Sequence, residues 1–116
     1  MKFTRLPYSK RVRIIQCFIE DIDATTTSKL LFVNRKTINA WYREIRRRLL
    51  PYSSQVQNVS KSSYKAFETR RLQKFYGLRI KDLPYHIAES RLRHVYGRRF
   101  RALIIDVTED LLTPLA

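Results

Sequence analysis

The chain has 116 residues, which suffice for one modest hydrophobic core or for two small helical units. Its 24 lysines and arginines against 10 acidic residues give a formal net charge of +14. Such an excess repels itself unless a polyanion neutralises it, so nucleic acid is the first class of partner to consider and an anionic membrane surface the second.

No stretch of the sequence has the apolar length of a membrane span or the pattern of a signal peptide. Cys17 is the single cysteine, which excludes an internal disulfide. These observations predict a protein of the reducing cytoplasm that has no membrane partner.

A first helix is expected from about Ser9 to Asp21. Serine is a residue type that caps helix N-termini, and apolar residues then recur at intervals of three and four, the spacing of one helical face. Cys17 lies within this apolar run, so we interpret it as a small buried residue and not as a catalytic thiol. The expected buried face consists of Val12, Ile15, Phe18, Ile19 and Ile22.

Two helices joined by a tight turn are expected after the polar stretch DIDATTT. The first spans residues 26–31 and would bury Leu30 and Leu31. The turn Phe-Val-Asn follows, and its Asn34 can cap the second helix. Pro51 would end that helix, because proline disfavours the helical conformation of the residue before it. The buried side of the second helix would consist of Ile38, Tyr42, Ile45 and Leu49, with Trp41 beside them.

The rest of the chain is expected to form a linker and a small helical segment. Residues 51–63 are rich in Ser, Gln and Asn, a composition typical of a linker, and apolar content recovers in residues 64–116. Gly77 and Gly97 are positioned to end two of the helices there. The three expected helices span about 64–76, the stretch KDLPYHIAESRLRHVYG (81–97) with Pro84 in its first turn, and 99–112. The apolar side of the last one would consist of Phe100, Leu103, Ile104, Val107 and Leu111.

The predicted fold class is therefore all-α, with a helix-turn-helix unit in residues 1–50, the linker, and the C-terminal helical segment. One stretch leaves a strand open, because RALIIDV is short and rich in β-branched residues.

Residues 24–43 have the layout of a DNA-binding helix-turn-helix, with two helices, a three-residue turn and a polar cap before the second helix. In such units the second helix enters the major groove, where its first residues meet base edges. Arginine can fork onto guanine and asparagine can pair with adenine, while arginines one turn further on suit phosphates. The residues expected to contact DNA are Asn34, Arg35, Lys36, Thr37, Asn39, Arg43, Arg46, Arg47 and Arg48.

Two observations compete with this interpretation. The same residues would also form the solvated basic face of an ordinary packing helix. In addition, Phe32 occupies a turn position that often needs a positive φ, which a bulky residue disfavours. The turn therefore either differs from the standard one or carries strain.

The segment TTSKLLFVNRKTINAWYREIRRRL resembles the N-terminal helix-turn-helix of bacterial insertion-sequence transposases of the ISXO-like, DDE type. The family pattern is a small residue, a Leu-Leu-Gly-Val turn, a polar cap, then Thr-Val and an aromatic pair, and Phe32 here replaces the glycine. The segment FETRRLQKFYGLRIKDLPYHIAESRLRHVYGRR is similar to the family's extreme C-terminus, although His94 and Val95 depart from it. The residues in register are Leu30, Leu31, Val33, Asn34, Thr37, Ile38, Trp41 and Tyr42 in the first segment, and Arg70, Arg71, Leu72, Lys74, Phe75, Gly77, Glu89, Leu92 and Arg93 in the second.

The resemblance implies a chain that lacks the family's catalytic core. That core is an RNase H-like domain whose acidic residues hold divalent metal, and it lies between the two matching ends. Here only residues 51–63 occupy that interval, and they contain no Asp or Glu. We therefore expect no enzyme activity, no catalytic metal and no cofactor. Asp106, Glu109 and Asp110 are interpreted as a solvated face or as counter-charges for nearby arginines, and not as metal ligands.

The expected function is that of a DNA-binding, transposase-derived protein, a remnant or truncated transposase that binds double-stranded element DNA in the nucleoid. A homodimer or a complex with intact transposase stays open. One alternative is a small helix-turn-helix transcriptional regulator, whose dimer would use Phe100, Leu103, Ile104 and Val107. The other is a basic RNA-associated protein, which would stack bases on the aromatic residues of region 64–76.

Overall fold

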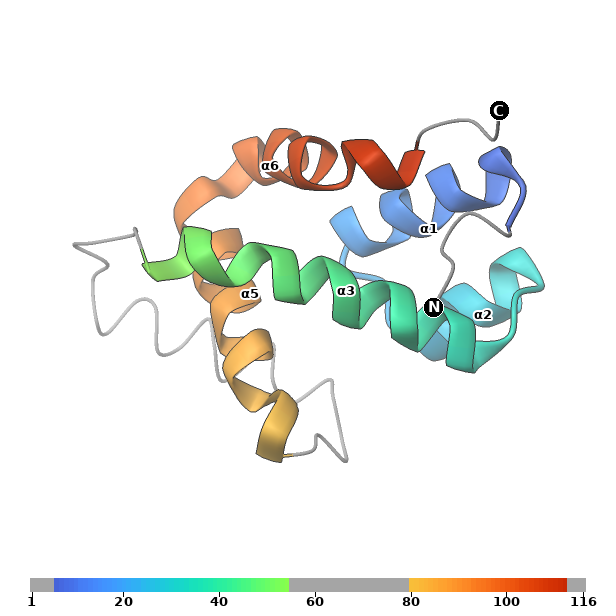
Figure 1. Cartoon of the computed structure of the whole chain (residues 1–116), viewed down its shortest axis with the longest axis horizontal. Helices are drawn as coiled ribbons and strands as arrows, with labels where there is room; N and C mark the ends of the chain where they lie inside the picture. Colours follow the sequence, from blue (N-terminus) through green and yellow to red (C-terminus); the bar gives the residue numbers. More distant parts are fainter. Residues whose placement is uncertain (1–5, 55–79, 113–116) are drawn as a thin grey trace. The chain divides into compact units, whose positions relative to one another are not determined.

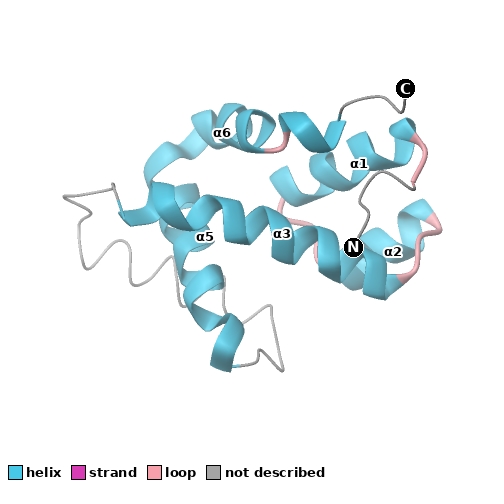
Figure 2. Ribbon diagram, viewed as in Figure 1, coloured by secondary structure: helices cyan, strands magenta, loops and turns pink. Residues whose placement is uncertain are grey.

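The computed structural model describes residues 6–54 and 80–112, and all of their regular structure is helical (Figures 1 and 2). The all-α class is thus confirmed for these residues. The stretch RALIIDV, which left a strand open, is helical. The helix expected at 64–76 and most of the expected linker lie outside the described residues. The α-helices are α1 (Tyr8–Ile19), α2 (Ala24–Leu31), α3 (Arg35–Ser54), α5 (Leu83–Tyr96) and α6 (Phe100–Val107), and the 3₁₀ helices are η2 (Ile80–Asp82), η3 (Gly97–Arg99) and η4 (Glu109–Leu112).

The chain divides into two compact units. One comprises Met1–Ile45 and Arg101–Ala116, and the other comprises Arg46–Phe100. The C-terminal residues therefore group with the N-terminal helices and not with the residues that precede them. The predicted boundary at residue 63 stays a prediction, because it lies outside the described ranges.

In the first unit, α1 begins one residue earlier than expected, and Ser9 is not its cap. Pro7 precedes the helix, and its carbonyl oxygen accepts the N–H groups of Lys10 and Arg11 at 3.0 and 3.1 Å. The Pro7 carbonyl thus accepts hydrogen bonds at the start of the helix, where the Ser9 side chain was expected to be the acceptor. The buried face of α1 consists of Arg11, Ile14, Ile15, Cys17 and Phe18.

The helix α2 also begins earlier than expected, at Ala24, because Asp23 is its cap. The Asp23 carboxylate accepts the Thr26 backbone N–H at 2.7 Å. Only one of the two leucines expected in the core is buried: Leu31 is 5 % exposed, whereas Leu30 is 58 % exposed. Consecutive residues project about 100° apart around a helix. When only a narrow strip of the helix contacts the core, one of two neighbouring residues is buried and the other faces solvent.

The helix α3 begins as expected and ends later. The Asn34 side-chain oxygen accepts the Lys36 N–H at 2.8 Å, which confirms Asn34 as the cap. Pro51 lies inside the helix, which continues to Ser54, so the expectation that proline ends it is wrong. The proline ring fixes φ near the helical value, and its missing N–H removes one backbone hydrogen bond, so the helix can continue through it. The predicted stripe of Ile38, Trp41, Tyr42, Ile45 and Leu49 is buried.

The Tyr42 side chain connects the three helices of the N-terminal region. Its ring meets the Phe18 ring of α1 edge-on, with the centroids 5.1 Å apart. Its hydroxyl donates to the Ile22 carbonyl at 2.8 Å and lies 2.8 Å from the Thr27 hydroxyl of α2. Because the Tyr42 proton is used on Ile22, Thr27 is the donor in the second bond. Tyr42 is 2 % exposed and Thr27 is fully buried, so water cannot replace either partner.

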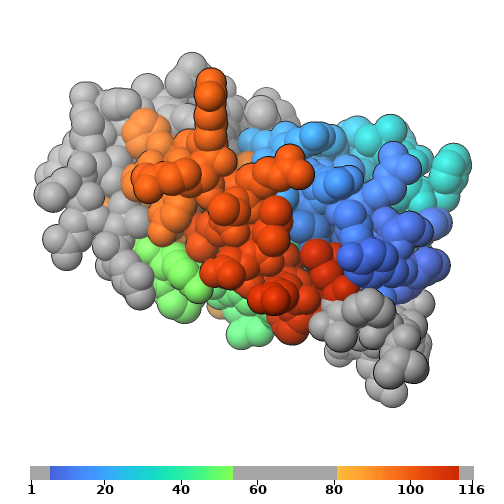
Figure 3. All heavy atoms as spheres, turned by 90° about the horizontal axis from the view of Figure 1, so that it is seen from above, coloured from blue at the N-terminus to red at the C-terminus, as the bar shows by residue number. Residues whose placement is uncertain are grey.

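The C-terminal residues pack on α1 through a buried arginine. Arg11 is only 1 % exposed. Its guanidinium group donates to the Leu111 carbonyl at 3.0 Å and to the Leu6 carbonyl at 3.1 Å. In Figure 3 the red atoms of the C-terminal helical residues lie against the blue atoms of α1. The buried Thr108 hydroxyl donates to the Ile104 carbonyl at 2.6 Å where α6 ends. The backbone of η4 thus supplies an acceptor for a charge on α1.

The second unit contains the C-terminal part of α3 together with η2, α5 and η3. Pro84 lies in the first turn of α5, and Gly97, with φ 54°, ends it, both as expected. The buried face of α5 includes Glu89, which the sequence did not mark as a core residue. Of the residues expected on the apolar side of the last helix, Phe100, which belongs to this unit, is buried. Leu103 and Ile104, which belong to the first unit, are also buried, and Val107 is half-buried.

Replacing Tyr42 with phenylalanine should lower the free energy of unfolding by about 1–3 kcal/mol, because the buried Thr27 hydroxyl and Ile22 carbonyl lose their partner. Urea denaturation followed by circular dichroism measures this change. Tyr8→Phe is the control, since Tyr8 is 50 % exposed and its variant should differ by less than about 0.5 kcal/mol. Equal stability of the two variants would contradict the hydrogen-bonding role.

The cap at Asp23 should make stability depend on pH. Hydrogen bonds from the Thr26 side chain, and then from its backbone N–H, hold the pKa of the Asp23 carboxyl below its ordinary value. A lowered folded-state pKa gives stability that is present above the ordinary pKa and is lost as the pH falls through the folded-state value.

Asp23→Ala should therefore cost about 1 kcal/mol near pH 7, and less in acid. Asp23→Asn keeps a capping oxygen without a titrating group, so it should lose less near neutral pH and should flatten the acid dependence. Urea midpoints measured for the three proteins from neutral pH down to about pH 3 test this. An Asp23→Asn protein with the same acid dependence as the parent would show that other carboxyl groups produce it.

Candidate nucleic-acid interface

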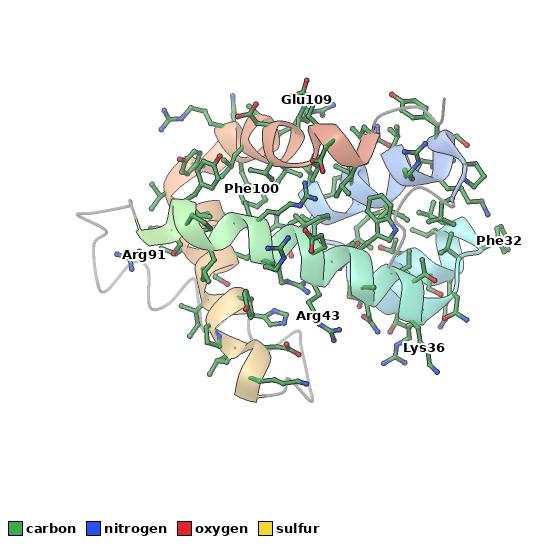
Figure 4. The ribbon with its side chains drawn as sticks, viewed as in Figure 1. Phe32, Lys36, Arg43, Arg91, Phe100 and Glu109 are labelled. Atoms are coloured by element: carbon green, nitrogen blue, oxygen red, sulfur yellow. The ribbon has the colours of Figure 1, made fainter. Side chains whose placement is uncertain are left out.

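The exposed face of α3 lies opposite its buried stripe. Lys36, Asn39 and Arg43 are all exposed and follow one another at intervals of three and four, so they lie on one side of the helix. Around the helix they are about 100–180° from Ile38 and Ile45, which are fully buried. Figure 4 shows Lys36 and Arg43 projecting from the same side of α3. The burial of the stripe therefore decides which side chains a partner can reach.

The first turn of α3 favours an anion. Arg35 and Lys36 are exposed there, the turn contains no acidic residue, and the helix N-terminus carries the positive end of the helix dipole. Asn34 lies at this end as expected, but its side-chain oxygen is occupied by the Lys36 N–H. Thr37 is half-buried, beside the exposed face. Of the predicted contact residues in this unit, Asn34, Arg35, Lys36, Asn39 and Arg43 are exposed, and Asn34 differs from the others in that its side-chain oxygen serves as the helix cap.

The turn before α3 is held by Ser28. The Ser28 carbonyl accepts the N–H groups of Phe32 and, at 3.3 Å, Val33, while its hydroxyl donates to the Val33 carbonyl at 2.7 Å. These bonds close the end of α2 in the manner of a helix C-cap. Phe32 has φ 54° and ψ 43°, the left-handed conformation. Such a conformation costs a residue with a Cβ atom about 1–2 kcal/mol, so the turn carries strain at Phe32.

The three consecutive arginines, Arg46 to Arg48, belong to the second unit and are not equivalent. Arg46 lies 2.7 Å from the Glu89 carboxylate, and its side chain is only 12 % exposed. The expectation that Arg46 contacts phosphate therefore does not fit its surroundings. Arg47 is exposed and Arg48 is half-buried, so of the three Arg47 is the one placed to meet a polyanion.

Glu89 is the residue that sequence reasoning missed here. Its carboxylate is 1 % exposed and accepts from both Arg46 and Arg93 at 2.7 Å. The Arg93 guanidinium in turn lies over the Phe100 ring, 4.4 Å from its centroid. A buried carboxylate is stable only when paired in this way. A usable signal was present, because Glu89 and Arg93 are four residues apart on a predicted helix.

Other expected features can be located in the described residues. Asp106, Glu109 and Asp110 are exposed, as expected, and Arg98 and Arg99 add exposed positive charge in η3. Residues 6–54 and 80–112 contain no group of three or more metal-ligating side chains. Nor does any helix in those ranges have the length and apolar character needed to cross a membrane.

Comparison with known proteins adds no relative: no protein-family model, no curated protein and no solved structure matches the chain. The similarity to ISXO-like transposases therefore stays a prediction that depends on the residues quoted for it.

Replacing Phe32 with glycine should raise the free energy of unfolding by about 0.5–1 kcal/mol. Removing the left-handed strain gains about 1–2 kcal/mol, and the greater freedom of glycine in the unfolded chain offsets part of this. Because Phe32 is 89 % exposed, little packing is lost. The urea midpoint measures the change, with Leu30→Ala as a control that removes an exposed apolar side chain from a helical position. A destabilised Phe32→Gly protein would mean that the ring packs on the fold.

Proposed function

We propose that this chain binds duplex DNA by placing the N-terminal half of α3 in the major groove, and that it carries out no reaction of its own. The observation that supports this most is the division of α3 into two faces. Ile38, Trp41 and Ile45 are fully buried, and the opposite face consists of exposed basic and amide side chains directly after a tight turn.

The spacing of the exposed side chains suits the groove. Lys36 and Arg43 are seven residues apart, or about 10 Å along the helix axis, and base pairs stack about 3.4 Å apart. The exposed face thus covers about three base pairs. Arg43 can fork onto guanine, Asn39 can pair with adenine, and the first turn can accept a phosphate at the helix N-terminus.

The transposase part of the proposal comes from the resemblance alone. It makes the ends of an insertion element the natural DNA target, and a remnant or truncated transposase the natural source of a chain that occupies those ends without cutting them. The same proposal places this DNA binding in the nucleoid, where the chain would act alone or together with an intact transposase.

The two alternatives receive less support. A regulator that dimerises through Phe100, Leu103 and Ile104 would need those side chains at its surface, and all three are buried within the chain. The aromatic residues that an RNA-stacking protein would use lie outside the described residues. The duplex-binding face is therefore the better basis for an experiment.

The experiment compares the parent chain with an Asn39→Ala, Arg43→Ala double variant. The preferred duplex is first selected from random sequences, with candidate terminal repeats added to the pool, and binding to it and to a scrambled duplex is followed by fluorescence anisotropy over a salt series. The variant should lose about 10- to 100-fold of its preference for the selected duplex, because each base contact supplies about 1–3 kcal/mol of discrimination. Its salt dependence should stay nearly that of the parent chain.

The matched control is Arg13→Ala, Gln16→Ala, which removes one exposed arginine and one exposed amide from α1. It should keep the full sequence preference. If the parent chain binds selected and scrambled duplexes equally, the exposed face of α3 serves only phosphates and sequence reading is disproved. Tighter binding to single-stranded RNA than to any duplex would favour the RNA-associated alternative.

A further inference from the structure

Among the described residues, Phe32 is the large apolar side chain with the greatest exposure, at 89 %. Figure 4 shows it projecting from the α2–α3 turn into solvent. Its neighbours in the chain, Leu31 and Val33, are 5 % and 7 % exposed. The chain therefore places two apolar residues in the core and turns the larger one between them outwards.

This arrangement does not serve the stability of the fold. The Phe32 ring buries almost no surface, and its backbone is in the strained left-handed region that glycine would adopt freely. Strain of this kind persists where the surrounding structure imposes it, and it is concentrated at functional sites. The bonds to Ser28 hold the backbone of the turn in place, so the Cα–Cβ bond of Phe32 points away from the core before any partner binds.

The surroundings of Phe32 indicate what it would contact. Lys29, Arg35 and Lys36 are all exposed close to it in the sequence, so an apolar protein surface would have to tolerate three positive charges. A polyanion that presents an apolar group is a better match. Duplex DNA has such a group in the major groove, the 5-methyl group of thymine, which phenylalanine side chains contact in protein–DNA complexes.

We propose that Phe32 is a specificity-determining residue that contacts the 5-methyl group of a thymine next to the bases met by the first turn of α3. This inference depends on the proposed function, because it needs the N-terminus of α3 in the major groove. It adds an apolar contact to a recognition face that otherwise consists of charged and amide groups.

The test removes the methyl group from the DNA and the ring from the protein. Each thymine of the selected duplex is replaced in turn by deoxyuridine, which pairs in the same way but lacks the methyl group. For the parent chain, one replacement should weaken binding about three- to tenfold, the effect of withdrawing one methyl contact. Phe32→Gly and Phe32→Asn both suit a left-handed backbone, and both should bind the thymine and deoxyuridine duplexes equally.

Ile105→Ala is the matched control, because Ile105 is another exposed apolar residue, at 46 %, and lies on α6. This variant should retain the full deoxyuridine effect of the parent chain. The combination of parent and variant proteins with both duplexes forms a double-mutant cycle, which isolates the contact between ring and methyl group from any general loss of affinity.

The other outcomes separate this inference from the proposed function. If the parent chain prefers the selected duplex but no deoxyuridine weakens binding, the methyl contact is disproved and the proposed function stands. A deoxyuridine effect that persists in both Phe32 variants assigns the methyl group to another side chain. If sedimentation shows two copies on the duplex and one copy after Phe32→Gly, Phe32 contacts a second chain instead. A chain without any sequence preference overturns both proposals.

Discussion

The side chain of Tyr42 is the point on which the N-terminal unit depends. From α3, its ring contacts Phe18 of α1, and its hydroxyl bonds to Thr27 of α2 and to the Ile22 carbonyl between those two helices. Burying Tyr42 fixes the rotation of α3 about its own axis. The face with Lys36, Asn39 and Arg43 must then point to solvent. The candidate recognition surface is thus a consequence of how the core is packed and requires no separate device.

The basic residues of the chain lie in two kinds of surroundings that composition cannot distinguish. Arg11 and Arg46 are held inside their units, the first by carbonyl oxygens and the second by Glu89. Such guanidinium groups connect distant segments, and their N–H groups are engaged inside the protein. Arg35 and Arg43 are exposed and can neutralise phosphate. A count of basic residues therefore overstates the number of cationic side chains that a nucleic acid would contact.

The α2–α3 turn combines stability and strain in three residues. Ser28 and Asn34 supply the bonds that end one helix and begin the next, and both follow well-known rules of capping. Phe32 lies between them in a conformation that its side chain disfavours, exposed and directly before the basic face. Ser28 and Asn34 thus follow local conformational preferences, and Phe32 between them does not. Such a departure is the pattern expected where a residue is retained for binding and not for folding.

The sequence by itself determined the features that depend on near neighbours along the chain: the helical class, the buried stripe of α3, the Asn34 cap and the difficulty at Phe32. Helical periodicity and capping act over about four residues, so one sequence suffices to see them. Only the tertiary structure decided that Leu30 is exposed, that Arg11 bonds to the Leu111 carbonyl and that Arg46 pairs with Glu89. In these cases the environment of a side chain depends on residues far away in the chain, and no local pattern contains that information.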